Sequence, residues 1–151
     1  MSMVRYVRTL GRSSRRYAAR HGAVLVEFAF VCPLLLMTAI ACADLGRVSH
    51  YYETVANAAR VGAETGACQQ FSEINRPAWE ARIRQSVEAE LQTLPGFNAS
   101  DMTYGLAVTD KPDGSHEIEV NVGYRFRMWL RWPGLPANVD LEKQVTYRQF
   151  R

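Results

Sequence analysis

The feature that most constrains this chain is a run of 21 residues, Ala23 to Ala43, in which Glu27 is the only charged residue. A membrane-spanning helix needs about 20 apolar residues, whereas the apolar part of a secretory signal has about 7 to 15. The length of the run therefore predicts a helix that crosses a membrane once. Pro33 lies inside it, and we expect a kink there because proline removes a backbone hydrogen bond.

The charges are distributed unevenly along the chain. The residues before the apolar run include six arginines and no acid, namely Arg5, Arg8, Arg12, Arg15, Arg16 and Arg20. Basic residues next to a span are retained in the cytoplasm, so we expect the N-terminus inside and the remainder outside. The whole chain has a net charge of +3, but the part from Ala23 onward has 15 acids and 12 bases. A domain that binds nucleic acid has a basic face, so we expect no nucleic-acid partner.

The apolar run also allows a second interpretation, an ordinary export signal. Ala41-Cys42-Ala43 matches the small-residue pattern at which a signal peptide is cut, which would leave a secreted domain beginning at Asp44. A lipid anchor on Cys42 is a weaker variant, because Ala39, three residues earlier, is not a larger aliphatic. Against both interpretations stand the length of the run, Glu27 near its start, and helical sequence that continues across the cut.

Helical spacing continues beyond the apolar run. Residues recur at steps of three and four, namely Val48, Tyr51, Tyr52, Val55, Ala59, Gly62, Ala63 and Gly66. We expect one helix from Ala23 to about Gly66, roughly 65 Å long. Its second half has a stripe of small residues, namely Ala56, Ala59, Gly62, Ala63 and Gly66. Small residues let backbones approach closely, so the stripe packs either on another helix of an assembly or on the globular part of the same chain.

A second helix and three strands are predicted after the long helix. Asn75 can cap the second helix, Pro77 suits its first turn, and Pro95-Gly96 ends the run. Its apolar face consists of Trp79, Ile83, Val87, Leu91 and Leu94, with Glu80–Arg84 and Arg84–Glu88 pairs on the wet side. Alternating stretches begin at Met102, His116 and Val139, and a turn at 110–114 separates the first two. We therefore expect an α+β fold with an antiparallel three-stranded sheet.

Several short motifs now occur in a recognisable order. Gly22, Glu27 and Phe28 form a G-x-x-x-x-E-[FY] site, Pro33 to Leu36 read P-L-L-L, and Ala58 to Ala63 read A-A-R-V-G-A. After a basic leader, this order closely resembles the TadE-like family of bacterial tight-adherence pilus proteins. The resemblance covers about Arg20 to Ala67. It implies a minor pilin or pseudopilin that helps to assemble a thin Flp-type (type IV) pilus for cell adhesion.

The resemblance also implies a processing site. A membrane-embedded prepilin peptidase would cut between Gly22 and Ala23 at the cytoplasmic face and leave Glu27 as the fifth mature residue. The new α-amine of Ala23 could then pair with the Glu27 carboxylate of a neighbouring subunit or of the same chain. Loss of one partner of a buried ion pair costs about 3 to 5 kcal/mol, so this pairing would fix the register between helices. Alternatively, Glu27 is only recognised by the peptidase, or it reaches the membrane interface.

No feature of the sequence indicates an enzyme. His21, His50 and His116 have no spaced metal or nucleophile partner, and there is no glycine-rich phosphate loop. We therefore expect no catalytic residues, no cofactor and no metal. The basic and aromatic residues of 125–132 resemble a nucleic-acid or membrane-surface strip. We expect them instead to alternate between the core and the solvent face of a strand.

The combined expectation is a single-pass protein of the bacterial inner membrane with a pilin-like lollipop shape. It has a cytoplasmic leader (1–22), a transmembrane helix (23–43), a periplasmic continuation of that helix (44–67) and a small α+β head (68–151). Its expected helix-packing residues are Pro33, Ala59, Gly62, Ala63 and Gly66. Its expected partners are the prepilin peptidase, other pilin or pseudopilin subunits, inner-membrane assembly proteins and the lipid bilayer. The protein acts either within the inner-membrane machine or in the filament.

Overall fold

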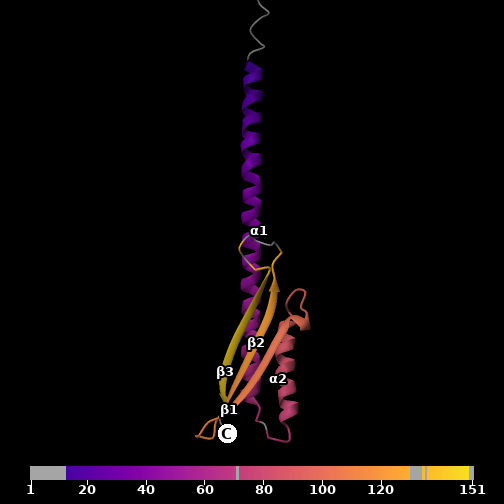
Figure 1. The fold of residues 1–151 in the computed structure, drawn as a ribbon, viewed down its shortest axis with the longest axis vertical. Coiled ribbons are helices and arrows are strands. Elements are labelled where there is room, and N and C mark those ends of the chain that lie inside the picture. Colours follow the sequence, from indigo (N-terminus) through magenta and orange to yellow (C-terminus); the bar gives the residue numbers. More distant parts are fainter. Residues whose placement is uncertain (1–12, 71, 130–133, 135, 150–151) are drawn as a thin grey trace, which may run out of the picture. The chain divides into compact units, whose positions relative to one another are not determined.

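The computed structural model describes residues 13–70, 72–129, 134 and 136–149, and it describes side chains in the first helix from residue 22 onward. The elements are helix α1 (Ser13–Cys68), helix α2 (Arg76–Leu91), a 3₁₀ turn η1 (Ala99–Asp101) and strands β1 (Met102–Asp110), β2 (His116–Arg127) and β3 (Asn138–Gln149) (Figure 1). This is the predicted α+β combination of a long apolar helix, a second helix and three strands. The chain divides into two compact units, Met1–Ala43 and Asp44–Arg151.

The first unit contains the apolar part of α1. Pro33 lies inside the helix. Nearly all side chains from Gly22 to Ala43 are exposed, including Leu25 at 68 % and Phe30 at 79 %. Exposure of so much apolar surface to water is unfavourable, so an apolar environment must cover this part of the helix.

The second unit contains an antiparallel sheet in the order β1-β2-β3. The central strand places Val120 opposite Leu106 on one side and opposite Val145 on the other. The predicted turn joins β1 to β2, and its Gly114 has a φ of +80°, which favours glycine. Hydrogen bonds from Ser115 to the Asp113 carboxylate lower the pKa of Asp113 and help to fix this turn.

One face of the sheet packs against the helices. The predicted apolar face of α2 is buried, as is Leu94 beyond its end, and β2 supplies a buried residue at alternate positions, such as Ile118 and Val120. Two local predictions about α2 are wrong. Asn75 occupies the N-cap position, but its side chain accepts a hydrogen bond from the Ser72 N–H and caps nothing. Glu80 pairs with Arg76 instead of Arg84.

The second half of α1 belongs to the core of the second unit. Its buried hydrophobic residues are Tyr51, Val55, Ala58, Ala59 and Ala63. Near the end of α1, the Gln149 amide of β3 donates hydrogen bonds to the carbonyl groups of Gly66, Ala67 and Gln69. The compact unit therefore begins at Asp44, whereas the sequence placed the start of the head at residue 68. Residues 44–67 supply core side chains and do not act only as a stalk; the domain bounds expected from the sequence stay a prediction.

Candidate processing and assembly segment

The residues expected at the processing site lie on the exposed first unit. A Cβ added to Gly22 would meet no heavy atom within 4 Å. Glu27 is exposed, and among the described side chains none makes an ion pair or a hydrogen bond with it. Ala23 is also exposed, and Phe28 is 60 % exposed. Within the described chain, packing therefore requires neither a glycine at position 22 nor a carboxylate at position 27.

The small-residue stripe packs inside the second unit. A Cβ on Gly62 would lie 2.6 Å from Cγ2 of Val87 and 3.3 Å from Cγ1 of Val120. A Cβ on Gly66 would lie 3.0 Å from Cδ1 of Ile83. Ala59 and Ala63 are fully buried as well. Of the two alternatives that the sequence left open, the structure shows the contact with α2 and β2 of the same chain.

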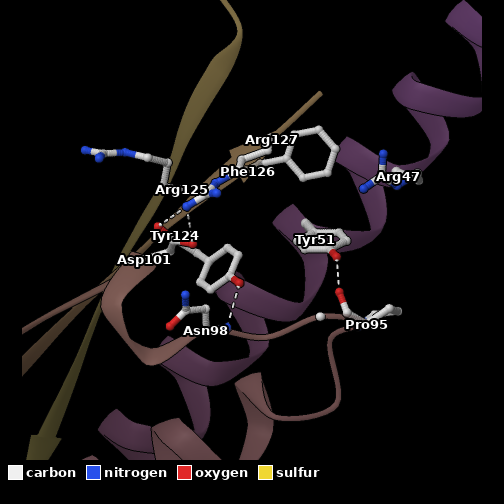
Figure 2. A pocket seen from close by; sticks show the side chains of 10 residues that line it. Arg47, Tyr51, Pro95, Asn98, Asp101, Tyr124, Arg125, Phe126 and Arg127 are labelled. Atoms are coloured by element: carbon white, nitrogen blue, oxygen red, sulfur yellow. Dashed lines mark hydrogen bonds and ion pairs between the residues drawn. The ribbon is translucent and has the colours of Figure 1, made fainter. Parts of the chain in front are cut away.

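A cavity of about 230 Å³ lies where Arg47 and Tyr51 of α1 face the end of β2 (Figure 2). Aromatic rings line one side, with Tyr51 and Phe126 edge to face at 4.9 Å. The Tyr51 hydroxyl donates to the carbonyl of Pro95 at 2.6 Å, and the Tyr124 hydroxyl accepts from the N–H of Asn98 at 3.2 Å. These bonds hold the segment between α2 and β1 against α1 and β2.

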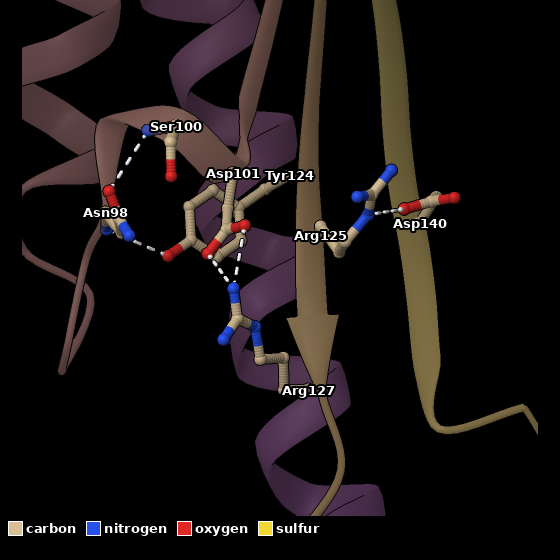
Figure 3. Close-up of polar contacts among 7 residues, drawn as sticks. All are labelled: Asn98, Ser100, Asp101, Tyr124, Arg125, Arg127 and Asp140. Carbon is tan, nitrogen blue, oxygen red and sulfur yellow. Dashed lines mark hydrogen bonds and ion pairs between the residues drawn. The ribbon is translucent and has the colours of Figure 1, made fainter.

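Three arginines line the cavity, and each is paired with a carboxylate. Arg127 donates to both oxygens of Asp101 at 3.1 Å, and Arg125 donates to Asp140 at 3.1 Å (Figure 3). The third, Arg47, donates to Asp44 at 3.1 Å. The cavity wall is therefore close to neutral. Within the described part of the chain, no group of three or more His, Cys, Asp or Glu side chains could hold a metal ion.

Arg47 belongs to a contact that sequence analysis did not find. Its guanidinium lies 5.0 Å from the ring centroid of Phe126 and 4.1 Å from that of Trp129. As predicted for a strand, Phe126 is buried and Arg125 and Arg127 are exposed. Trp129 lies beyond the end of β2, is 69 % exposed, and rests on α1 through Arg47. The only local signal is the i,i+3 spacing of Asp44 and Arg47.

The comparison with known families identifies most of α1. Residues 22–64 match the family model described as TadE-like protein. These residues are a TadE-like segment. No curated protein and no solved structure matches the chain.

The TadE-like segment confirms the resemblance seen in the sequence. It begins at Gly22, includes Glu27, and extends to Glu64, so it also covers Ala59 and Ala63, which are buried in the second unit. It supports a protein associated with the tight-adherence (Tad/Flp) pilus. By length and composition, α1 also contains a segment that could cross a membrane. Together, the segment and the apolar helix are compatible with a single-pass membrane protein.

Proposed function

We propose that this protein is a minor pilin or pseudopilin that takes part in assembly of a bacterial Flp-type pilus. A prepilin peptidase cuts it between Gly22 and Ala23. The chain acts by assembly with other subunits and not by catalysis. Before assembly it lies in the inner membrane, with its N-terminus in the cytoplasm and the unit that begins at Asp44 in the periplasm.

The observation that carries this proposal is the state of Gly22 and Glu27. Both stand in the spacing of a prepilin site at the start of the TadE-like segment. Neither has a structural task within the described chain, since Gly22 faces open space and Glu27 has no partner among the described side chains. A glycine and an isolated carboxylate next to an apolar run are costly unless something outside the chain uses them.

The exposed apolar surface supports the proposed partners. Phe28, Phe30 and Leu34 are 60 %, 79 % and 65 % exposed. Lipid covers this surface in the membrane, and apolar helices of other subunits replace lipid in an assembly. The Ala23 amine released by cleavage and the Glu27 carboxylate then offset each other, because an unpaired charge at that depth is unfavourable.

The mature N-terminus tests the proposal directly. We expect mass spectrometry of the protein from a host with its own pilus machinery to find Ala23 as the first residue. A chain that begins at Asp44, or that carries a lipid on Cys42, would contradict the proposal.

One observation favours the second candidate, an exported or lipid-anchored binding domain. The compact unit begins at Asp44, the residue that a signal-peptidase cut after Ala43 would leave first. However, the side chain of Asp44 is buried and bonded to Arg47 within a continuous helix. The TadE-like match also begins at Gly22 and covers residues on both sides of Ala43, so we prefer the pilin interpretation.

A further inference from the structure

The loop after β2 is bonded to the residue that follows the apolar run. Oδ1 of Asp44 accepts a hydrogen bond from Nη1 of Arg47 at 3.1 Å and lies 3.5 Å from the backbone nitrogen of Trp129. In the chain, Asp44 directly follows Ala43, the last apolar residue of the run. A residue held by Asp44 therefore lies at the edge of the bilayer when the run spans it.

The side chains at this point suit a membrane interface. Trp129 contacts the guanidinium of Arg47 at 4.1 Å but is 69 % exposed, and Leu45, beside Asp44, is also 69 % exposed. Tryptophan is enriched where headgroups meet acyl chains, because its ring is largely apolar and its N–H is polar. Arginine places its apolar stem along such a surface and its charge among polar groups.

The separation along the chain between Ala43 and Arg47 fits the thickness of the headgroup layer. Arg47 lies four residues after Ala43, which corresponds to about 6 Å of helix. The headgroup layer on each side of a bilayer is roughly 5 to 7 Å thick.

We propose that Trp129, with Arg47, forms a contact with phospholipid headgroups at the periplasmic face of the inner membrane. This inference rests on the proposed insertion of residues 23–43. The headgroup phosphate is the complementary ligand. A guanidinium has five N–H donors, and Asp44 accepts from Nη1 alone among the described contacts of Arg47. The contact anchors the second unit on the bilayer while the subunit is unassembled.

Tryptophan emission from the full-length protein in vesicles tests this contact. Trp132 is first replaced by Phe, so that Trp79 and Trp129 remain. The vesicles contain phosphatidylglycerol and phosphatidylcholine, with acyl chains brominated next to the headgroup in one set. The emission lost on adding Trp129→Phe is assigned to Trp129, because Trp79 is buried. We expect brominated lipid to quench most of this emission and aqueous iodide to quench little of it.

A matched control places a tryptophan farther along the helix. Tyr52 is exposed and lies nine residues after Ala43, about 13 Å along α1 and beyond the headgroup layer. In the chain that lacks Trp129 and Trp132, Tyr52→Trp should respond to iodide and not to brominated lipid. Arg47→Lys keeps the charge but loses the planar stack, so it should reduce the lipid quenching of Trp129.

The other outcomes overturn the inference in distinguishable ways. If the protein floats with the vesicles but iodide alone quenches Trp129, the side chain faces water and only this inference fails. If neither reagent reaches Trp129, another protein copy covers it, and the lipid contact is again wrong. If the protein does not float with the vesicles, the proposed membrane insertion fails together with the contact.

Discussion

Gly22 and Gly46 both lie on α1, and a Cβ added to either would meet nothing within 4 Å. They form a matched pair for the proposed peptidase. We predict that Gly22→Leu blocks leader removal, because the enzyme must approach the backbone closely at the cut, whereas Gly46→Leu is processed normally. Both variants should insert, since insertion depends on apolar length. An immunoblot of membrane fractions shows the unprocessed and mature forms, and normal maturation of Gly22→Leu would contradict the prediction.

Tyr104 on β1 gives a prediction at the same scale about pH. Its hydroxyl is buried without a hydrogen-bond partner among the described residues. Burial raises the pKa of Tyr104 to about 12. The charge of Glu80 adds to this increase, and the charge of Arg84 opposes it. An unfolded tyrosine ionises near pH 10, so the folded state holds more protons between about pH 10 and 12. The free energy of unfolding should therefore fall as the pH rises through this range.

We predict that Tyr104→Phe removes this part of the alkaline loss. At neutral pH the change should be neutral or stabilising by up to about 1 kcal/mol, because the hydroxyl makes no compensating bond. Thermal unfolding of the detergent-solubilised protein at about pH 7 and about pH 11 measures both effects. Tyr52→Phe, at an exposed position, is the control. An equal alkaline loss in Tyr104→Phe and wild type would show that Tyr104 does not cause it.

The side chains of α1 are mostly exposed before Asp44, whereas many are buried after it. Gly62 tests the packing of the buried part. We predict that Gly62→Ala destabilises the second unit by up to about 2 kcal/mol. Overpacking against Val87 costs about 1 to 3 kcal/mol, which exceeds the roughly 1 kcal/mol that alanine gains over glycine in a helix. Gly46→Ala, which meets no neighbour, should stabilise by up to about 1 kcal/mol. Denaturant midpoints of the two variants measure these changes in stability. If both substitutions stabilise the protein, the Val87 side chain moves aside at little cost.

The sequence predicted the elements well because their signals are periodic. The burial of Trp79, Ile83 and Val87 follows from a repeat of 3.6 residues, and β2 from a repeat of two. The errors concern choices between nearly equal local partners. Glu80 has an arginine four residues away on each side, and it pairs with Arg76. Such choices depend on small energy differences that periodicity does not contain.

The sequence predicted the motif around Gly22 and Glu27 but not the contact between Asp44 and Trp129. The motif around Gly22 and Glu27 is local, and the TadE-like match covers it. The contact between Asp44 and Trp129 joins residues 85 positions apart, and no sequence pattern predicts it. The stripe around Gly62 was ambiguous for a related reason, because small residues suit any close neighbour and only the fold supplies Val87 and Val120.

For the whole molecule, the unit boundary predicts which fragment folds. Residues 44–151 should show a cooperative thermal transition by circular dichroism, and residues 68–151 should show none. The shorter fragment loses the core side chains on α1, among them Tyr51 and Val55, and the carbonyl groups of Gly66 and Ala67 that Gln149 binds. Each large buried side chain contributes roughly 1.5 to 3 kcal/mol, against a typical total stability of about 5 to 15 kcal/mol. A cooperative transition in the shorter fragment would restore the boundary near residue 68.

Glu27 tests the assembly itself. Glu27→Gln keeps the size of the side chain and removes its charge, and Glu27→Val also removes its polarity. If the carboxylate offsets the Ala23 amine in the assembled helices, both variants should insert and Glu27→Val should insert at least as well as wild type. Both should assemble poorly, because an unpaired buried charge costs about 3 to 5 kcal/mol, or roughly 100-fold or more in subunit affinity.

Surface pili, counted by electron microscopy, and the fraction of mature protein in the membrane separate these two effects. The comparison is made between variants that are cleaved, so that a defect in peptidase recognition is not mistaken for a defect in assembly. The Gln variant should be cleaved at least in part and should form few pili. Wild-type numbers of pili from a normally cleaved Glu27→Val protein would mean that assembly does not need the pairing. Glu27 would then be a carboxylate that the membrane interface tolerates.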